Sequence, residues 1–255
     1  MNKVAEVRNL YFSYSQEPVL KDINLTVHRG DFIVFIGPNG SGKSTLLKLM
    51  IGELKPDRGE IQLLGKDIGK FYEWHRVGYM SQQIRNFNKS FPATVNEVVA
   101  AALYKEMGFF KVLNIRLEKR IEEVLELVGM ADFRDRQIGK LSGGQQQKVF
   151  IARTLVTEPE IIFLDEPLVG IDLKAQEDFI NLLNRLNQDL NITIIMVVHE
   201  LQLIREAQKI AYFKGGEVFL YNQQEFASTG YLNKDLLKGD TVPEVEYSSG
   251  GDYNA

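Results

Sequence analysis

The stretch "DFIVFIGPNGSGKSTLLKLM", from Asp31 to Met50, carries the pattern that decides the fold. Its first part, Asp31 to Gly37, is a β-branched and aromatic run that ends in glycine, which is typical of a buried strand. The residues from Lys43 onward are predicted to form a helix. Strand, glycine-rich loop and helix therefore follow one another in the order that an α/β fold requires.

The loop, "GPNGSGKST", has the spacing Gly, four residues, Gly-Lys-Ser/Thr between a predicted strand and a predicted helix, as a nucleotide-binding phosphate loop does. Its glycines let backbone N–H groups turn toward phosphates, and the start of the helix favours an anion. We expect Lys43 to reach the β- and γ-phosphates and the Ser44 hydroxyl to coordinate Mg²⁺. An ordinary glycine-rich turn would account for the glycines alone. The residues expected to contact the nucleotide are Gly37, Pro38, Asn39, Gly40, Ser41, Gly42, Lys43, Ser44 and Thr45.

Two carboxylates follow a second apolar run, "IIFLDEP". A carboxylate at the carboxyl end of a buried strand lies where ligands gather in open α/β sheets. Asp165 is expected to hold the Mg²⁺ shell, and Glu166, which points elsewhere, to act as general base toward the attacking water. Taken alone, two acids after a strand would equally fit the amino-terminal cap of a helix. The phosphate loop upstream favours the catalytic interpretation.

The rest of the chain separates into strand-like and helical parts. "ITIIMVVHE" is apolar on both faces, as expected of a central parallel strand, and "AQEDFINLLNRLNQDL" has the spacing of a crossover helix. The amino-terminal "VAEVRNLYFSYS" and "VLKDINLTVHRG", and the later "GEIQLLGKDI", alternate like an antiparallel β layer. From about Thr94 to Leu155 the pattern is helical only. We therefore predict an α/β core with a parallel central sheet, an amino-terminal antiparallel β layer and an inserted all-helical subdomain.

The composition of the 255-residue chain excludes several kinds of site. Without cysteine there are no disulfides, thiolate zinc sites or cysteine nucleophiles. The formal net charge of −4 gives no electrostatic reason to expect nucleic acid or anionic lipid as the main partner. Apolar runs such as "ITIIMVV" are too short to cross a bilayer, and the first residues hold no apolar stretch of signal-peptide length. We expect a cytoplasmic protein, or one bound to a membrane only through other subunits.

Four motifs in a fixed order resemble those of the ATP-binding subunit of an ABC transporter: "GPNGSGKST", "LSGGQ", "IIFLDEP" and "VVHEL". The resemblance extends over roughly residues 4–221, and "LSGGQ" is the signature of that family. It implies a P-loop NTPase core of the RecA-like type. The implied boundaries are one ABC domain over residues 1–235, with a core of about 1–86 and 156–225 and a helical subdomain of about 87–155, followed by a loose polar tail over 236–255.

The resemblance also implies roles for individual side chains around the γ-phosphate. Gln82 matches the glutamine that touches Mg²⁺ and the attacking water and connects the core to the helical subdomain, although Gln83 beside it leaves the register open by one residue. His199 matches the histidine that contacts the γ-phosphate and fixes Glu166 and the water. Tyr14 matches the aromatic residue that stacks on adenine; a tyrosine inside a core strand would show the same pattern.

The signature begins a predicted helix, but no lysine follows it, so alone it is half of a phosphate site. The resemblance implies that it acts in trans and caps ATP held by the phosphate loop of another subunit. The residues implied in this contact are Ser142, Gly143, Gly144 and Gln145, and Asp172 matches the aspartate of the loop that joins the two ATP sites. A single set of motifs favours a homodimer, and pairing with a related subunit stays open.

A transporter that contains this chain needs separate permease subunits in the membrane. The resemblance implies that these subunits dock on the helical subdomain. It also implies that an extracytoplasmic solute-binding protein acts through them. Phe87, Phe91, Phe109 and Phe110 are more aromatic residues than a solvated loop needs. An exposed aromatic patch there would mark a partner surface. Each phenylalanine would equally fit a place inside the subdomain.

The process that ATP hydrolysis drives is inferred from the family resemblance. Soluble ABC ATPases that act in DNA repair, in chromosome maintenance or on ribosomes carry long coiled coils, zinc fingers or two ATP-binding modules, and this sequence has none of these features. A helper protein of iron–sulfur assembly has a similar single module and stays open as an alternative. The segment "SFPATVNEVVAAAL" is similar to one in importers of divalent metals such as zinc or manganese. Importers of iron–siderophore or cobalamin complexes are the alternative. We therefore expect an ATP- and Mg²⁺-dependent subunit on the cytoplasmic face of the cell membrane.

Overall fold

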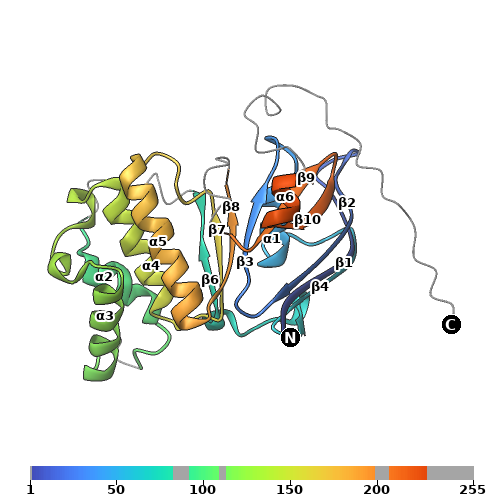
Figure 1. Ribbon diagram of the computed structural model, residues 1–255. Helices are drawn as coiled ribbons and strands as arrows, with labels where there is room; N and C mark the ends of the chain where they lie inside the picture. The colour runs from blue at the N-terminus through green and yellow to red at the C-terminus, as the bar shows by residue number, and fades with distance from the viewer. Residues whose placement is uncertain (1, 83–91, 109–112, 199–206, 229–255) are drawn as a thin grey trace, which may run out of the picture.

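The computed structural model describes residues 2–82, 92–108, 113–198 and 207–228 of the chain. Two β-sheets face each other across helix α1, and helices α2 to α5 lie on the other side of the larger sheet (Figure 1). The α-helices are α1 (Lys43–Met50), α2 (Val95–Ala100), α3 (Ile115–Leu127), α4 (Gly143–Leu155), α5 (Leu173–Leu190) and α6 (Gln223–Ser228). Short 3₁₀ turns are η1 (Ile68–Lys70), η2 (Trp74–Arg76), η4 (Ala101–Leu103), η5 (Ala131–Phe133) and η6 (Ile138–Lys140).

The larger sheet has six strands in the order β10-β9-β3-β8-β7-β6. Its strands are β3 (Phe32–Ile36), β6 (Val77–Met80), β7 (Ile161–Asp165), β8 (Thr193–Val197), β9 (Lys209–Lys214) and β10 (Glu217–Asn222). The pairs from β9 to β6 are parallel, which confirms the predicted parallel core. The pattern did not predict β10, which pairs antiparallel with β9 at the edge of the sheet.

Strand β3 shows why this sheet reads as a continuous apolar run. Phe32, Val34 and Ile36 belong to the hydrophobic core on the side of α2 to α5. Ile33 and Phe35 belong to the core on the side of α1. Because successive strand residues point to opposite faces and both faces are covered, all five residues are buried. The phosphate-loop sequence thus starts from a fully buried strand in the middle of the large sheet.

The smaller sheet is the predicted amino-terminal antiparallel layer. It has the order β2-β1-β4-β5, and its strands are β1 (Lys3–Ser13), β2 (Pro18–His28), β4 (Arg58–Leu63) and β5 (Lys66–Asp67). Helix α1 is enclosed between the two sheets, with Leu46, Leu47 and Leu49 fully buried. The helix that carries the end of the phosphate loop is therefore held from both sides.

Helices α2, α3 and α4 lie between β6 and β7 in the chain, where the helical insertion was predicted. A capping box starts α2: the Thr94 hydroxyl accepts from the Glu97 N–H at 3.2 Å, and the Glu97 carboxylate accepts from the Thr94 N–H at 2.8 Å. Helix α4 returns to the sheet over β6, where a side chain at Gly78 would lie 2.2 Å from Thr154 Cγ2. The four phenylalanines, for which both an exposed patch and a place inside the subdomain were considered, and the tail over 236–255 lie outside the described residues.

Candidate nucleotide-binding site

The phosphate loop, Gly37 to Thr45, leaves the end of β3 and turns into α1. Gly37 has φ 143°, and a Cβ there would lie 2.3 Å from the Phe213 carbonyl oxygen. Gly42, the residue before α1, has φ 100°, and a Cβ there would lie 2.6 Å from Leu20 Cδ2. Both positions combine the left-handed region with a lack of space, so only glycine fits without strain. The loop is wedged between β9 and β2.

Lys43 lies inside the curve of this loop. Its Nζ donates to the carbonyl oxygens of Gly37 at 2.9 Å and Pro38 at 2.8 Å, and the residue is only 4% exposed. Burial lowers the pKa of the Lys43 ammonium, and the charges of Glu166 and Asp165 oppose that shift. The result is a positive charge in a concave, backbone-lined setting, which suits a polyphosphate.

Asp165 is the last residue of β7 and is 3% exposed. Phe163, two residues earlier, belongs to the core on the α1 side, so the alternation of the strand points Asp165 to the same side. There the Ser44 hydroxyl donates to Asp165 Oδ1 at 2.7 Å. A hydroxyl and a carboxylate in contact are oxygen ligands of the kind that Mg²⁺ uses beside substrate phosphates. Among the described residues no cluster of three or more His, Asp or Glu could hold a metal without such help.

Glu166 has an unusual backbone for a residue with a side chain. Its φ is 51°, and its N–H donates to the Val197 carbonyl oxygen at 3.2 Å, which fixes the turn after β7 to the end of β8. Its carboxylate accepts from Gln82 Nε2 at 2.8 Å. The alternative that these acids cap a helix does not hold, since Asp172 is the cap of α5. Gln82, just beyond β6, and Glu166 are brought together across the carboxyl edge of the sheet.

Tyr14 lies just beyond β1 and is 62% exposed, so it is not a core strand residue. Its ring meets the Phe12 ring edge-on at 4.9 Å between centroids. Its hydroxyl is 3.4 Å from Thr45 Oγ1, the last residue of the phosphate loop. An exposed, supported ring next to a phosphate-binding loop is placed for stacking on a base.

The signature segment, Ser142 to Gln145, starts α4 and uses two of its side chains locally. The Ser142 hydroxyl accepts from the Gln145 N–H at 3.3 Å, and the Gln145 side-chain oxygen accepts from the Ser142 N–H at 3.0 Å. This capping box was missed in the sequence, although Ser-x-x-Gln before an apolar run is its signal. A Cβ at Gly144 would lie 2.7 Å from Ala175 Cβ, so the starts of α4 and α5 are in close contact.

Asp172 likewise serves its own helix, since its carboxylate accepts from the Ala175 N–H at 3.0 Å. Helices α4 and α5 lie on one side of the large sheet and α1 on the other (Figure 1). The structure therefore brings together the phosphate loop, Tyr14, Asp165, Glu166 and Gln82, but not the signature segment. His199 and Gln83 lie outside the described residues. In the described part of the chain, no helix has the length and apolar character needed to span a bilayer.

Comparison with known proteins gives consistent matches. A family model described as ABC transporter matches residues 20–169. The zinc uptake system ATP-binding protein ZurA of Listeria innocua is 48% identical over 201 residues, which are 79% of this chain and 78% of that protein. The manganese transport system ATP-binding protein MntB of Halalkalibacterium halodurans is 39% identical over 245 residues, 96% of this chain and 89% of that protein.

A solved structure with a similar fold is the dimeric post-hydrolysis state of the ATP-binding cassette MJ0796 bound to ADP and Pi. It superposes with a TM-score of 0.71 and 30% identity over 86% of this chain and 98% of that one.

Proposed function

Because the chain belongs to the ABC transporter family and is an ATPase of that family, we propose that its ATP hydrolysis drives import of a divalent metal ion, zinc or manganese. The observation that supports hydrolysis most directly is a set of three contacts at one edge of the sheet. Lys43 holds the phosphate loop closed, Ser44 donates to Asp165, and Gln82 donates to Glu166. These contacts join three separate segments of the chain at one place.

The proposed reaction uses the carboxylates in different ways. Ser44, Asp165 and Gln82 would hold Mg²⁺, which would supply positive charge beside the phosphates. Glu166 faces away from Asp165 and accepts the proton of a water whose oxygen attacks the γ-phosphorus, while the bond to the β-bridging oxygen breaks and ADP leaves. Gln82 holds the Glu166 carboxylate in position from β6. Lys43 stabilises the charge on the leaving and transferring phosphates.

The second half of each site comes from a second copy of the chain in this proposal. The signature segment lies at the amino terminus of a helix, where anions are favoured, but on the side of the sheet away from its own phosphate loop. Two copies facing each other would each place Ser142 to Gln145 over the ATP of the other. The similarity to a dimeric cassette bound to ADP and Pi supports this arrangement.

The permease subunits have a suitable docking site in the groove of about 950 Å³ between η2, β6, η4 and α4. Tyr72, Trp74 and Tyr104 line it with exposed aromatic surface of the kind that marks a partner site. Its charged lining consists of Lys105, Arg116, Arg120 and Arg153, against the carboxylates Glu106 and Glu158. We expect the docking segment to be amphipathic and to bring acidic side chains. Docking there would place this chain on the cytoplasmic face of the membrane.

The cargo is tested with the chain assembled with its permease subunits in vesicles. A solute-binding receptor loaded with Zn²⁺ or Mn²⁺ is expected to stimulate ATPase activity several-fold over the unloaded receptor. Stimulation by a siderophore- or cobalamin-loaded receptor, and not by the metal-loaded one, would replace the metal assignment with the alternative. ATPase activity that no receptor changes would contradict transport itself.

A further inference from the structure

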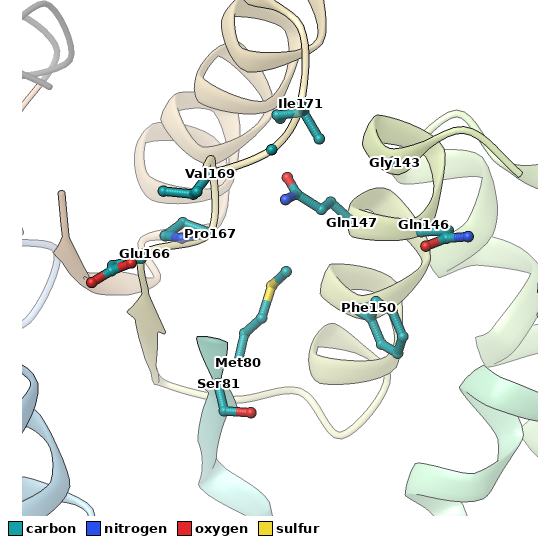
Figure 2. A pocket seen from close by; sticks show the side chains of 11 residues that line it. Met80, Ser81, Gly143, Gln146, Gln147, Phe150, Glu166, Pro167, Val169 and Ile171 are labelled. Carbon is teal, nitrogen blue, oxygen red and sulfur yellow. The ribbon is translucent and has the colours of Figure 1, made fainter. Parts of the chain in front are cut away.

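A second pocket, of about 280 Å³, lies between α4, the end of β6 and the loop 166–171 (Figure 2). The apolar part of its wall is formed by Met80, Phe150, Pro167, Val169 and Ile171, and the other lining residues are Ser81, Gly143, Gln146, Gln147, Glu166 and Gly170. Figure 2 shows Met80 rising from below, Phe150 on α4 at one side, and the loop 166–171 at the other. No residue of the phosphate loop lines it, and it shares Ser81 and Phe150 with the neighbouring aromatic groove proposed for the permease.

One polar side chain points from α4 into this pocket. Gln147 is 7% exposed, and its Oε1 is buried with no hydrogen-bond donor among the described residues. Two nearby glutamine side chains do form hydrogen bonds. Gln146 Nε2 donates to the Ile138 carbonyl oxygen at 3.1 Å, and Gln176 Nε2 donates to the Leu168 carbonyl oxygen at 3.3 Å. A buried acceptor without a donor is costly, so a molecule that brings one gains that interaction.

The size and lining of the pocket define the ligand. An apolar cavity of about 150 Å³ accepts benzene, and this pocket is about 280 Å³, so a molecule with two fused rings fits. The Met80 thioether and the Phe150 ring are favourable neighbours for an aromatic ligand. From these features we infer that the pocket binds a small aromatic molecule with one N–H or O–H donor directed at Gln147 Oε1, and that its occupation slows ATP turnover.

The expected effect on ATP turnover follows from the two segments that form the walls of the pocket, α4 and the loop 166–171. Loop 166–171 begins with Glu166, and α4 begins directly after Ser142. Gly143, the first residue of α4, and Glu166 both line the pocket, so a bound molecule contacts the start of the signature helix and the proposed base together. A ligand there fixes the signature segment relative to Glu166 without touching the phosphate loop. Inhibition is therefore expected without competition with ATP.

Binding is measured by isothermal titration calorimetry on the full chain with indole and with 1-methylindole, which lacks the N–H. We expect indole to bind roughly tenfold more tightly, because a hydrogen bond to a buried acceptor is worth about that factor. Gln147→Met, which keeps the length of the side chain and removes the acceptor, should abolish the difference. Equal affinity of both probes for the unmodified chain, no binding of either, or an unchanged preference in Gln147→Met would overturn the inference.

A second variant makes the test independent of how well Gln147→Met folds. Val169 is 41% exposed at the rim, so Val169→Trp is expected to fold, which thermal unfolding checks, and to fill the pocket from the loop side. It should lower indole affinity at least tenfold. Full indole binding by a folded Val169→Trp would place the ligand elsewhere and refute the assignment.

The regulatory part is measured as ATPase activity with and without indole, and this arm alone rests on the proposed ATP hydrolysis. We expect indole to lower kcat and leave the KM for ATP unchanged. A raised KM with unchanged kcat would mean that indole competes for the nucleotide site, and unchanged kinetics at saturating indole would mean that the pocket has no regulatory role. A chain without any ATPase activity would contradict the proposed function but leave the binding result standing.

Discussion

Replacing Gly144 by alanine tests whether the contact between α4 and α5 is as close as the structure shows. The new Cβ would lie 2.7 Å from Ala175 Cβ. Carbon atoms attract best at about 3.5–4.0 Å, so the two helix starts have to separate by about 1 Å. Such overpacking costs about 1–3 kcal/mol.

One smaller effect opposes this cost. Alanine is favoured over glycine inside a helix by about 0.5–1 kcal/mol, which offsets part of the cost. We therefore expect Gly144→Ala to lower the free energy of unfolding by about 1–2 kcal/mol, with a fall in Tm of about 2–4 °C for each kcal/mol. Gly143→Ala is the matched control. Its Cβ would lie 3.1 Å from Ile171 Cγ2, the end of a flexible side chain that is able to rotate aside, so we expect little or no loss.

Equilibrium unfolding in urea measures the effect, and a double-mutant cycle with Ala175→Gly isolates the contact. Ala175→Gly removes the atom that Gly144→Ala would strike, so the double variant should recover about 1 kcal/mol relative to the sum of the single changes. If Gly144→Ala is as stable as the unmodified chain, or the coupling energy is near zero, the close contact is wrong. Equal losses for Gly143→Ala and Gly144→Ala would also contradict it.

Three further predictions concern the proposed catalytic site. Glu166→Gln should bind ATP as tightly as the unmodified chain and lose about 10²–10⁴-fold in kcat, because it cannot accept the proton of the water; near-normal turnover would remove Glu166 as the base. Ser44→Ala removes the hydroxyl that contacts Asp165, so the Mg²⁺ concentration that gives half-maximal ATPase activity should rise about tenfold. An unchanged Mg²⁺ titration would rule out a ligand role for this hydroxyl. Ser142→Gly keeps a good amino-terminal cap, so it should lower the free energy of unfolding by only a few tenths of a kcal/mol. Introduced into Glu166→Gln, it should nevertheless weaken ATP-driven dimerisation, which size-exclusion chromatography measures. Undiminished dimerisation would show that the hydroxyl makes no contact in trans.

The parts of the site that follow local patterns were predictable from the sequence. The strand, loop and helix from Asp31 to Met50 each have a short-range signal, and the side of β7 on which Asp165 lies follows from strand alternation. The contact between Ser44 and Asp165 joins residues 121 positions apart, and it was suggested only indirectly, by the separate assignment of both residues to Mg²⁺. A contact between residues that lie far apart in the sequence leaves no periodic pattern from which it could be predicted.

Other features depend on packing that no local pattern records. Glu166 takes a φ of 51° because its N–H reaches the Val197 carbonyl oxygen on the neighbouring strand, and nothing in "LDEP" predicts that turn. The exposure of Tyr14 is set by where β1 ends. The Gly144–Ala175 contact depends on how two helices meet. These positions are specified by tertiary structure.

The local role of the signature segment is compatible with the role proposed for it across a dimer. The Ser142 oxygen accepts from the Gln145 N–H, but a hydroxyl also has one proton to donate, which remains for an oxygen of a phosphate. The N–H groups of Gly143 and Gly144 stand in the first turn of α4, where no intrahelical acceptor is available. The capping box therefore fixes the direction of these donors while leaving them for a ligand. Ala175 of α5 packs against Gly144, whereas Ser142 and Gly143 are exposed, so these two residues are accessible to a phosphate that a second copy would present in the proposed dimer.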